Sequence, residues 1–168
     1  MITRYKYSEE RLVYASTELV WNLLSNCNYF PKWMPHVISV EHLGNTILEK
    51  GSILWVESLN EKRKGQSLCY VSECKENDMM SFLSNQNESE VCFSFQIKAE
   101  ENGLIKILMT VEIGLKWYWK ILFRRSFVNS IKTYGWLQLN ELDKAITEHR
   151  SQHSNIDVEL RQQLGLDN

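Results

Sequence analysis

One glutamine is the first candidate for chemistry in this chain of 168 residues. Gln138 lies in the middle of an otherwise apolar helical stripe, one turn after Tyr134. A buried amide without a partner costs about 1–3 kcal/mol, so we expect Gln138 to form a hydrogen bond. The partner is either a ligand carbonyl or hydroxyl, or a neighbour such as Tyr134, Tyr70 or a trapped water. The pattern therefore predicts a polar contact in a binding site or a satisfied core amide.

Carboxylates give a weaker signal for acid–base chemistry. Glu57 alternates in register with Trp55 in a strand-like run, and the sequence does not fix which side of that run faces inward. If Glu57 faces inward, burial raises its pKa toward a range useful for catalysis. Glu112 lies opposite an apolar face, so we expect it to be solvated. No acid–base pair can be assigned from these residues.

The histidines and cysteines do not predict a metal or cofactor site. His149 and His153 are four residues apart, a spacing that places both on one helix face, but no cysteine or carboxylate at a fixed spacing joins them. The four cysteines form no C-x-x-C pair, and we interpret them as reduced core residues. The chain also lacks a G-x-S-x-G motif, a P-loop and a Rossmann glycine pattern. We therefore predict no metal and no cofactor.

Composition excludes several classes of protein. The length fits one domain, and the formal net charge of −2 gives no reason to expect a nucleic-acid partner. The first residues contain no apolar segment typical of a signal peptide, and no apolar run is long enough to span a membrane. We expect a cytoplasmic protein.

The elements that must position these residues begin with a strand at 10–15 and a helix at 16–26. Ser16 or Thr17 can cap this helix, and its apolar residues share one face. Pro31 restricts the residue before it and cannot donate a backbone hydrogen bond, so the helix ends there. A short helix or turn at 29–34 follows, and Pro35 ends it.

Six strand-like runs separated by turn-like segments follow this corner. They span 37–43, 52–59, 66–75, 79–85, 90–99 and 104–115. The last two runs alternate cleanly between apolar and polar residues, which is typical of an antiparallel sheet with one covered and one wet face.

A long helix at 126–149 comes next, about 36 Å in length. Residues 151–168 form a polar tail, in which Ser154 can cap one more short helix ending at Gly165. The predicted organisation is one domain at 1–150 and a tail at 151–168.

The segment S-T-E-L-V-W-N-L-L-S-N (16–26), followed by Y-F-P-K-W-M-P-H-V (29–37), resembles the opening of bacterial members of the START-like superfamily called SRPBCC. The similarity continues through S-V-E-H-L-G (39–44) and G-S (51–52) and covers about residues 8–149. The resemblance implies an α+β helix-grip fold, with about seven antiparallel strands curved around the C-terminal helix. It also implies an internal cavity with two short helices closing one end. This superfamily includes the birch-pollen allergen, polyketide cyclases and lipid-transfer domains.

The implied cavity would be lined by apolar residues of the strands and the long helix. The candidate ligand-binding residues are Trp33, Trp55, Tyr70, Phe82, Phe93, Phe95, Met109, Val111, Phe127, Ile131, Tyr134 and Gln138. The alternative is that these side chains fill the interior and that Trp33 packs in the corner between the short helices and the sheet.

Two further features suggest partners outside the cavity. Residues 116–125 interleave lysine and arginine with aromatic residues, which favours a transient contact with a membrane or a protein, although half of them would equally well cap the core. Trp136 falls on the polar face of the long helix, where a tail helix or a second copy would cover it.

The sequence favours binding, and as an extension transport, of a small hydrophobic ligand such as a lipid, polyketide or isoprenoid. One alternative is an enzyme of the polyketide cyclase or dehydratase type, using Tyr134, Gln138 or Glu57. Another is an interaction module with a filled cavity. The sequence leaves the ligand and the oligomeric state open.

Overall fold

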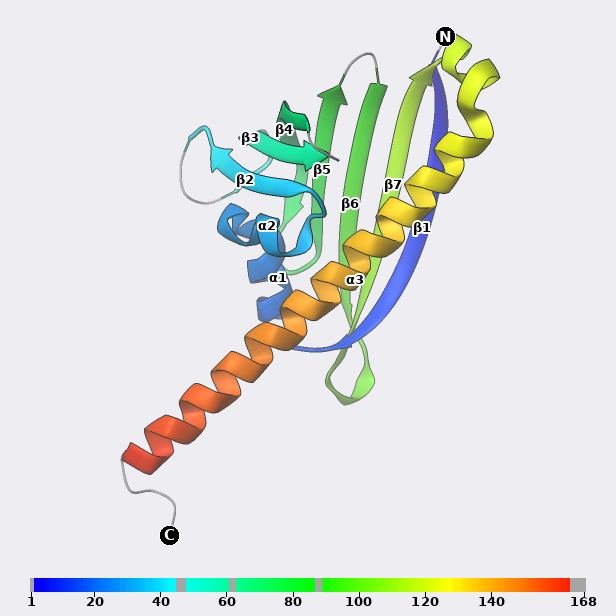
Figure 1. Ribbon diagram of the computed structural model, residues 1–168. Helices are drawn as coiled ribbons and strands as arrows, with labels where there is room; N and C mark the ends of the chain where they lie inside the picture. The colour runs from blue at the N-terminus through cyan, green and yellow to red at the C-terminus, as the bar shows by residue number, and fades with distance from the viewer. Residues whose placement is uncertain (1, 45–47, 61–62, 87–88, 164–168) are drawn as a thin grey trace.

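Seven antiparallel strands form one curved sheet, and a long helix crosses its concave face (Figure 1). The computed structural model describes residues 2–44, 48–60, 63–86 and 89–163, and in the long helix it describes side chains between residues 129 and 152. The predicted α+β helix-grip fold is confirmed. Its sheet is formed by strands β1 (Ile2–Tyr14), β2 (Val37–His42), β3 (Ile53–Asn60), β4 (Arg63–Lys75), β5 (Met79–Gln86), β6 (Ser89–Ala99) and β7 (Leu104–Lys116).

The strands follow the order β1-β7-β6-β5-β4-β3-β2, so the first two strands of the chain form the two edges of the sheet. Every neighbouring pair is antiparallel. β1 is longer than the predicted strand at 10–15, because its first half also pairs with β7, in register from Ile2 opposite Lys116. A short 3-10 turn, η2 (Glu101–Gly103), joins β6 to β7.

Two short helices and a 3-10 turn close one end of the sheet. Helix α1 (Thr17–Ser25) begins where the Ser16 hydroxyl accepts a hydrogen bond from the Leu19 N–H at 3.2 Å. The turn η1 (Cys27–Tyr29) and helix α2 (Phe30–Trp33) follow, as the predicted short helix at 29–34 requires. Pro31 lies in the first turn of α2, where a missing N–H costs nothing because that group has no partner within the helix.

Trp33 fixes this closure to the core. Its side chain is fully buried, and its indole Nε1 donates a hydrogen bond to the backbone oxygen of Leu23 at 2.9 Å. The ring also packs edge-on against Phe30 and Phe95, with centroids 5.4 Å apart in both pairs. One side chain therefore links α1, α2 and β6.

The long helix α3 (Trp117–Gln163) is a single element of 47 residues, about 70 Å in length. It begins nine residues earlier than the predicted helix at 126–149, so most of the predicted contact segment at 116–125 is helical. The predicted separate tail helix is also part of α3. The lower-propensity residues around Ser154 do not end a helix, and glycine and proline do not occur between Trp136 and Gln163. Figure 1 shows the C-terminal part of α3 extending past the sheet.

Gly135 allows α3 to lie close to the sheet. A Cβ atom at this position would be 2.9 Å from the Met109 Cε atom of β7 and 2.9 Å from the Tyr7 Cε1 atom of β1. The helix therefore sits over the β1–β7 pair. This placement leaves a space between α3 and the strands on the other side of the sheet.

Candidate functional site

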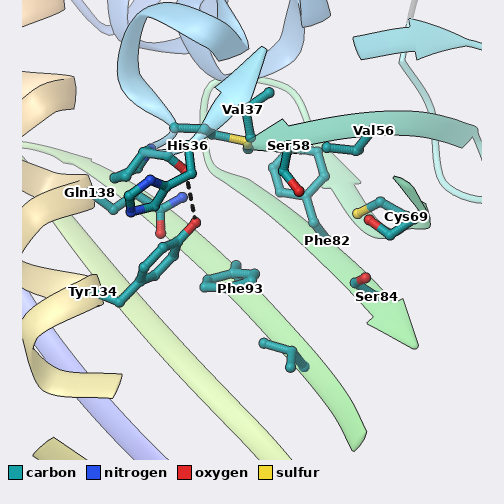
Figure 2. A pocket seen from close by; sticks show the side chains of 14 residues that line it. His36, Val37, Val56, Ser58, Cys69, Phe82, Ser84, Phe93, Tyr134 and Gln138 are labelled. Atoms are coloured by element: carbon teal, nitrogen blue, oxygen red, sulfur yellow. Dashed lines mark hydrogen bonds between the residues drawn. The ribbon is translucent and has the colours of Figure 1, made fainter. Parts of the chain in front are cut away.

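A cavity of about 300 Å³ lies between the sheet, α3 and the segment that follows α2 (Figure 2). Its lining comes from strands β2 to β6, from α3 and from the corner between α2 and β2. The lining residues are Met34, Pro35, His36, Val37, Val56, Ser58, Ser67, Cys69, Phe82, Ser84, Val91, Phe93, Tyr134 and Gln138. Most of these side chains are apolar or carry a single small polar group, as in sites for small organic molecules.

Gln138 is a buried polar residue of the cavity wall. It is 2% exposed, and no protein group of the described residues forms a hydrogen bond with its Oε1 atom. Figure 2 shows Gln138, His36 and Tyr134 together at one end of the cavity. This end therefore presents a buried acceptor to whatever occupies the space.

Tyr134 and His36 form the rest of this polar end. The Tyr134 hydroxyl donates a hydrogen bond to the backbone oxygen of Pro35 at 3.2 Å, and burial raises the pKa of Tyr134. The His36 ring stacks on Tyr134, with centroids 6.4 Å apart and planes 21° from parallel. His36 has a φ of 67°, a left-handed backbone conformation that is uncommon outside glycine and asparagine. The corner residues thus hold the ring over the tyrosine.

Small polar side chains of β3, β4 and β5 line the other end. The Ser84 hydroxyl donates a hydrogen bond to the Leu68 backbone oxygen at 3.3 Å. Burial raises the pKa of the Cys69 thiol to about 12. The thiol is therefore protonated at neutral pH and is a poor nucleophile, because only the thiolate reacts readily.

Glu57 lies outside the cavity. It accepts hydrogen bonds from Gln66 Nε2 at 2.9 Å and from the Ser39 hydroxyl at 3.0 Å, both on the outer face of the sheet. These two bonds hold the pKa of Glu57 below its usual value. The hypothesis of an inward, catalytic Glu57 is wrong, because its neighbours Val56 and Ser58 take the inward positions of β3.

The structure brings four of the candidate ligand-binding residues to the cavity. These are Phe82, Phe93, Tyr134 and Gln138. Four others are buried inside the domain without lining it: Phe95, Met109, Val111 and Ile131. Trp33 belongs to the packed corner described above. Phe127 lies outside the residues whose side chains are described.

Trp55 and Tyr70 do not line the cavity, because the neighbouring residues Val56 and Cys69 face it instead. Side chains alternate along a strand, so Trp55 and Tyr70 belong to the outer face. Both faces of β3 and β4 carry apolar residues here, and hydrophobicity alone could not separate them. Val91 was also missed, although it shares a face with Phe93 in the alternating pattern of the sequence.

A second hollow of about 250 Å³ lies on the outer side of the corner. Met34, Pro35, His36 and Val37 line both this hollow and the cavity. The outer hollow is completed by Pro31, Lys32, Trp33, Leu137 and Glu141. One stretch of four residues is therefore shared by the two spaces.

Metal ligands are not assembled in the part of the chain that the structure describes, where no three His, Cys, Asp or Glu residues cluster. His149 packs edge-on against Tyr29 at 6.0 Å, and the side chain of His153 lies outside the described set. Among the described helices, none combines the length and the apolar character that a membrane span requires.

Comparison with known proteins identifies the fold. No protein-family model matches the chain, and no curated protein matches it significantly. Solved structures do match. Ara h 8.0201 is 15% identical, with a TM-score of 0.70 over 87% of this chain and 99% of the other. A protein of unknown function from Staphylococcus aureus is 9% identical, with a TM-score of 0.75 over 89% of this chain and 98% of the other. The chain has the START-like fold.

The START-like fold is also found in norcoclaurine synthase from Thalictrum flavum, solved in complex with dopamine and hydroxybenzaldehyde. That structure is 12% identical, with a TM-score of 0.66 over 88% of this chain and 89% of the other. At these identities the START-like fold is shared, and the activity of a given chain depends on its own site residues. The predicted resemblance is confirmed for the fold.

Proposed function

We propose that this chain binds a small, mostly apolar molecule that carries one hydrogen-bond donor. The observation that supports this proposal is the unpartnered, 2% exposed Gln138 Oε1 atom at one end of an apolar cavity. A hydroxyl or N–H group on the ligand would satisfy this acceptor. In a carrier, the same molecule would be released again to another protein or membrane.

The size and lining of the cavity define the ligand class further. An apolar cavity of about 150 Å³ holds benzene, so a space of about 300 Å³ suits a molecule of roughly two fused rings or an equivalent chain. Phe82 and Phe93 offer aromatic faces for packing. The norcoclaurine synthase complex supports the proposal, because there the same fold accompanies small hydroxylated aromatic molecules.

Binding is favoured over catalysis by the groups that line the cavity. No carboxylate or amine is among the described lining residues, and the Cys69 thiol is protonated. An enzyme of the polyketide cyclase or dehydratase type would have only His36 and Tyr134 as acid–base groups here. The hypothesis of an interaction module predicted a filled interior, whereas this domain contains a cavity.

Two matched ligands test the proposal by isothermal titration calorimetry. 2-Naphthol offers a hydroxyl donor, and 2-methoxynaphthalene has nearly the same shape without one. We expect 2-naphthol to bind about fivefold more tightly, as one net hydrogen bond contributes about 1 kcal/mol. The substitution Val91→Trp fills the cavity and is expected to abolish binding of both compounds.

The control is Lys98→Trp, which adds the same side chain at an exposed position of β6 away from the cavity. It should leave both affinities unchanged. Failure of the wild-type protein to bind either compound would refute binding of this ligand class. Equal affinities for the two compounds would refute the role of Gln138 as an acceptor for the ligand.

A further inference from the structure

The two edges of the sheet differ in how well they are protected. β2 has six residues, and its register against β3 is interrupted between Val37 and Ser39. Short length and bulges are common ways to prevent an edge strand from pairing with another chain. β1 has 13 residues and an unbroken register against β7. The free edge of β1 is therefore a long, regular template for another strand.

Only the end of β1 is capped by the described part of the chain. Arg150 of α3 donates a hydrogen bond from Nη1 to the Tyr14 backbone oxygen at 2.7 Å and also lies over the Tyr14 ring. The rest of this edge, before Tyr14, carries charged side chains of both signs.

Charges along β1 are complementary to a second copy running in the opposite direction. The first half of the strand contains Arg4 and Lys6, and the second half contains Glu9, Glu10 and Arg11, of which Arg11 pairs with Asp143 of α3. The side chains of Lys6 and Glu10 are 64% and 65% exposed on the outer face, although each has an ion-pair partner on β7. Antiparallel pairing about Ser8 would place Lys6 of each copy opposite Glu10 of the other. Opposite charges at such cross-strand positions stabilise pairing.

An exposed tryptophan lies beside the centre of this edge. Trp136 is 50% exposed and precedes Asp143 and Arg150 at intervals of seven residues, so all three lie on one flank of α3. Asp143 pairs with Arg11 of β1 at 3.4 Å, and Arg150 contacts the end of β1. Trp136 therefore lies on the flank that faces β1.

The position of Trp136 along the length of β1 is given by its neighbour Gly135. Gly135 lies directly against the Tyr7 ring, next to Ser8. Figure 1 shows β1 at the outer edge of the sheet, with α3 running along it. Two copies related by a twofold axis at Ser8 would bring their two tryptophans toward the same axis.

We propose that β1 is the interface of a homodimer, in which a second copy of this chain pairs antiparallel about Ser8. The two sheets become continuous, and each Trp136 is covered by the partner. The interface is self-complementary, as a twofold dimer requires, because each Lys6–Glu10 contact occurs twice. This inference is independent of the ligand in the cavity.

Sedimentation velocity over a range of concentrations tests the proposal. We expect the wild-type protein to sediment as a dimer of twice the chain mass. Lys6→Glu and Glu10→Lys each oppose like charges at two symmetric positions, so each should weaken the dimer about tenfold. The double variant Lys6→Glu/Glu10→Lys restores opposite charges and should bring the dissociation constant back to near the wild-type value. Trp136→Ala should also weaken the dimer.

Lys75→Glu is the matched control, because it reverses an exposed charge on β4, which β7, β6 and β5 separate from β1, and should leave dimerisation unchanged. Circular dichroism of each variant establishes that the fold is retained. A wild-type protein that stays monomeric at the highest concentration tested would overturn the proposal. A dimer that neither single reversal nor Trp136→Ala weakens would also overturn it, as would a double variant that is weaker than both single variants.

Discussion

The substitution Gln138→Leu distinguishes the effect of Gln138 on the stability of the fold from its role as a hydrogen-bond acceptor for the ligand. Gln138 is 2% exposed, and its Oε1 atom has no protein partner among the described residues. Leucine is of similar size and leaves no polar atom without a partner. The substitution is therefore expected to make the empty protein more stable.

The magnitude follows from the cost of the unpaired acceptor. A buried polar atom without a partner costs about 1–3 kcal/mol, so Gln138→Leu should raise the free energy of unfolding by about 2 kcal/mol. For a domain of this size, that change corresponds to a rise in Tm of about 4–8 °C. The same substitution removes the acceptor, so the preference for 2-naphthol over 2-methoxynaphthalene should disappear.

Urea denaturation and thermal melts monitored by circular dichroism measure the stability, and calorimetry measures the ligand preference. Gln66→Leu is the control, because Gln66 donates a hydrogen bond to Glu57 on the outer face, and its loss should change stability by less than about 1 kcal/mol. A lower stability of Gln138→Leu would refute the reasoning, since it would show that the amide holds the fold together. A stabilised variant that keeps its preference for 2-naphthol would refute the ligand contact.

Three further predictions concern the packing and ionisation of the core. Trp33→Phe removes the hydrogen bond to the Leu23 oxygen and leaves that buried acceptor unpaired, so urea denaturation should show a loss of about 1–3 kcal/mol; an unchanged midpoint would contradict it. Gly135→Ala gains up to about 1 kcal/mol of helix propensity but places a Cβ 2.9 Å from the Tyr7 ring, so we expect net destabilisation by thermal melt, and a higher Tm would contradict the close approach. The pKa of Cys69 is raised from 9.0 to about 12, so its contribution to stability is complete below pH 9 and is lost as the pH rises toward 12. Cys69→Ala should therefore reduce the alkaline decline in the free energy of unfolding, and an unchanged decline would contradict this assignment.

The sequence predicted the architecture because its local signals agree with one another. The capped helix, the proline corner and the alternating strands each match the observed elements. Val91 and Phe93 illustrate why, since strict alternation in β6 leaves only one face apolar enough to be buried. Gln138 was identifiable for the same reason, as one polar residue within an apolar helical stripe.

The composition of the cavity wall could not be predicted in the same way. Trp55 and Val56 are both apolar, so no alternation distinguishes the two faces of β3 at that point. The pairing of β4 with β5 also shifts register between Val71 and Glu73, a local irregularity that has no sequence signal here. The smaller of two apolar neighbours faces the cavity in both strands, which leaves the space that a larger inward residue would fill.

The two ends of α3 could not be predicted from the local sequence pattern either. Amphipathic periodicity weakens before residue 126 and after residue 149, yet α3 continues in both directions. A helix ends where the chain contains a breaker or gains a competing contact, and loss of an apolar stripe is neither.

The corner of four residues from Met34 to Val37 is a partition one chain thick. The inner surface of these residues bounds the cavity, and their outer surface bounds the second hollow. Because these four residues line both spaces, a displacement of them would change the shape of both. A ligand that displaces these four residues would therefore also alter the second hollow, which Leu137 and Glu141 of α3 help to line.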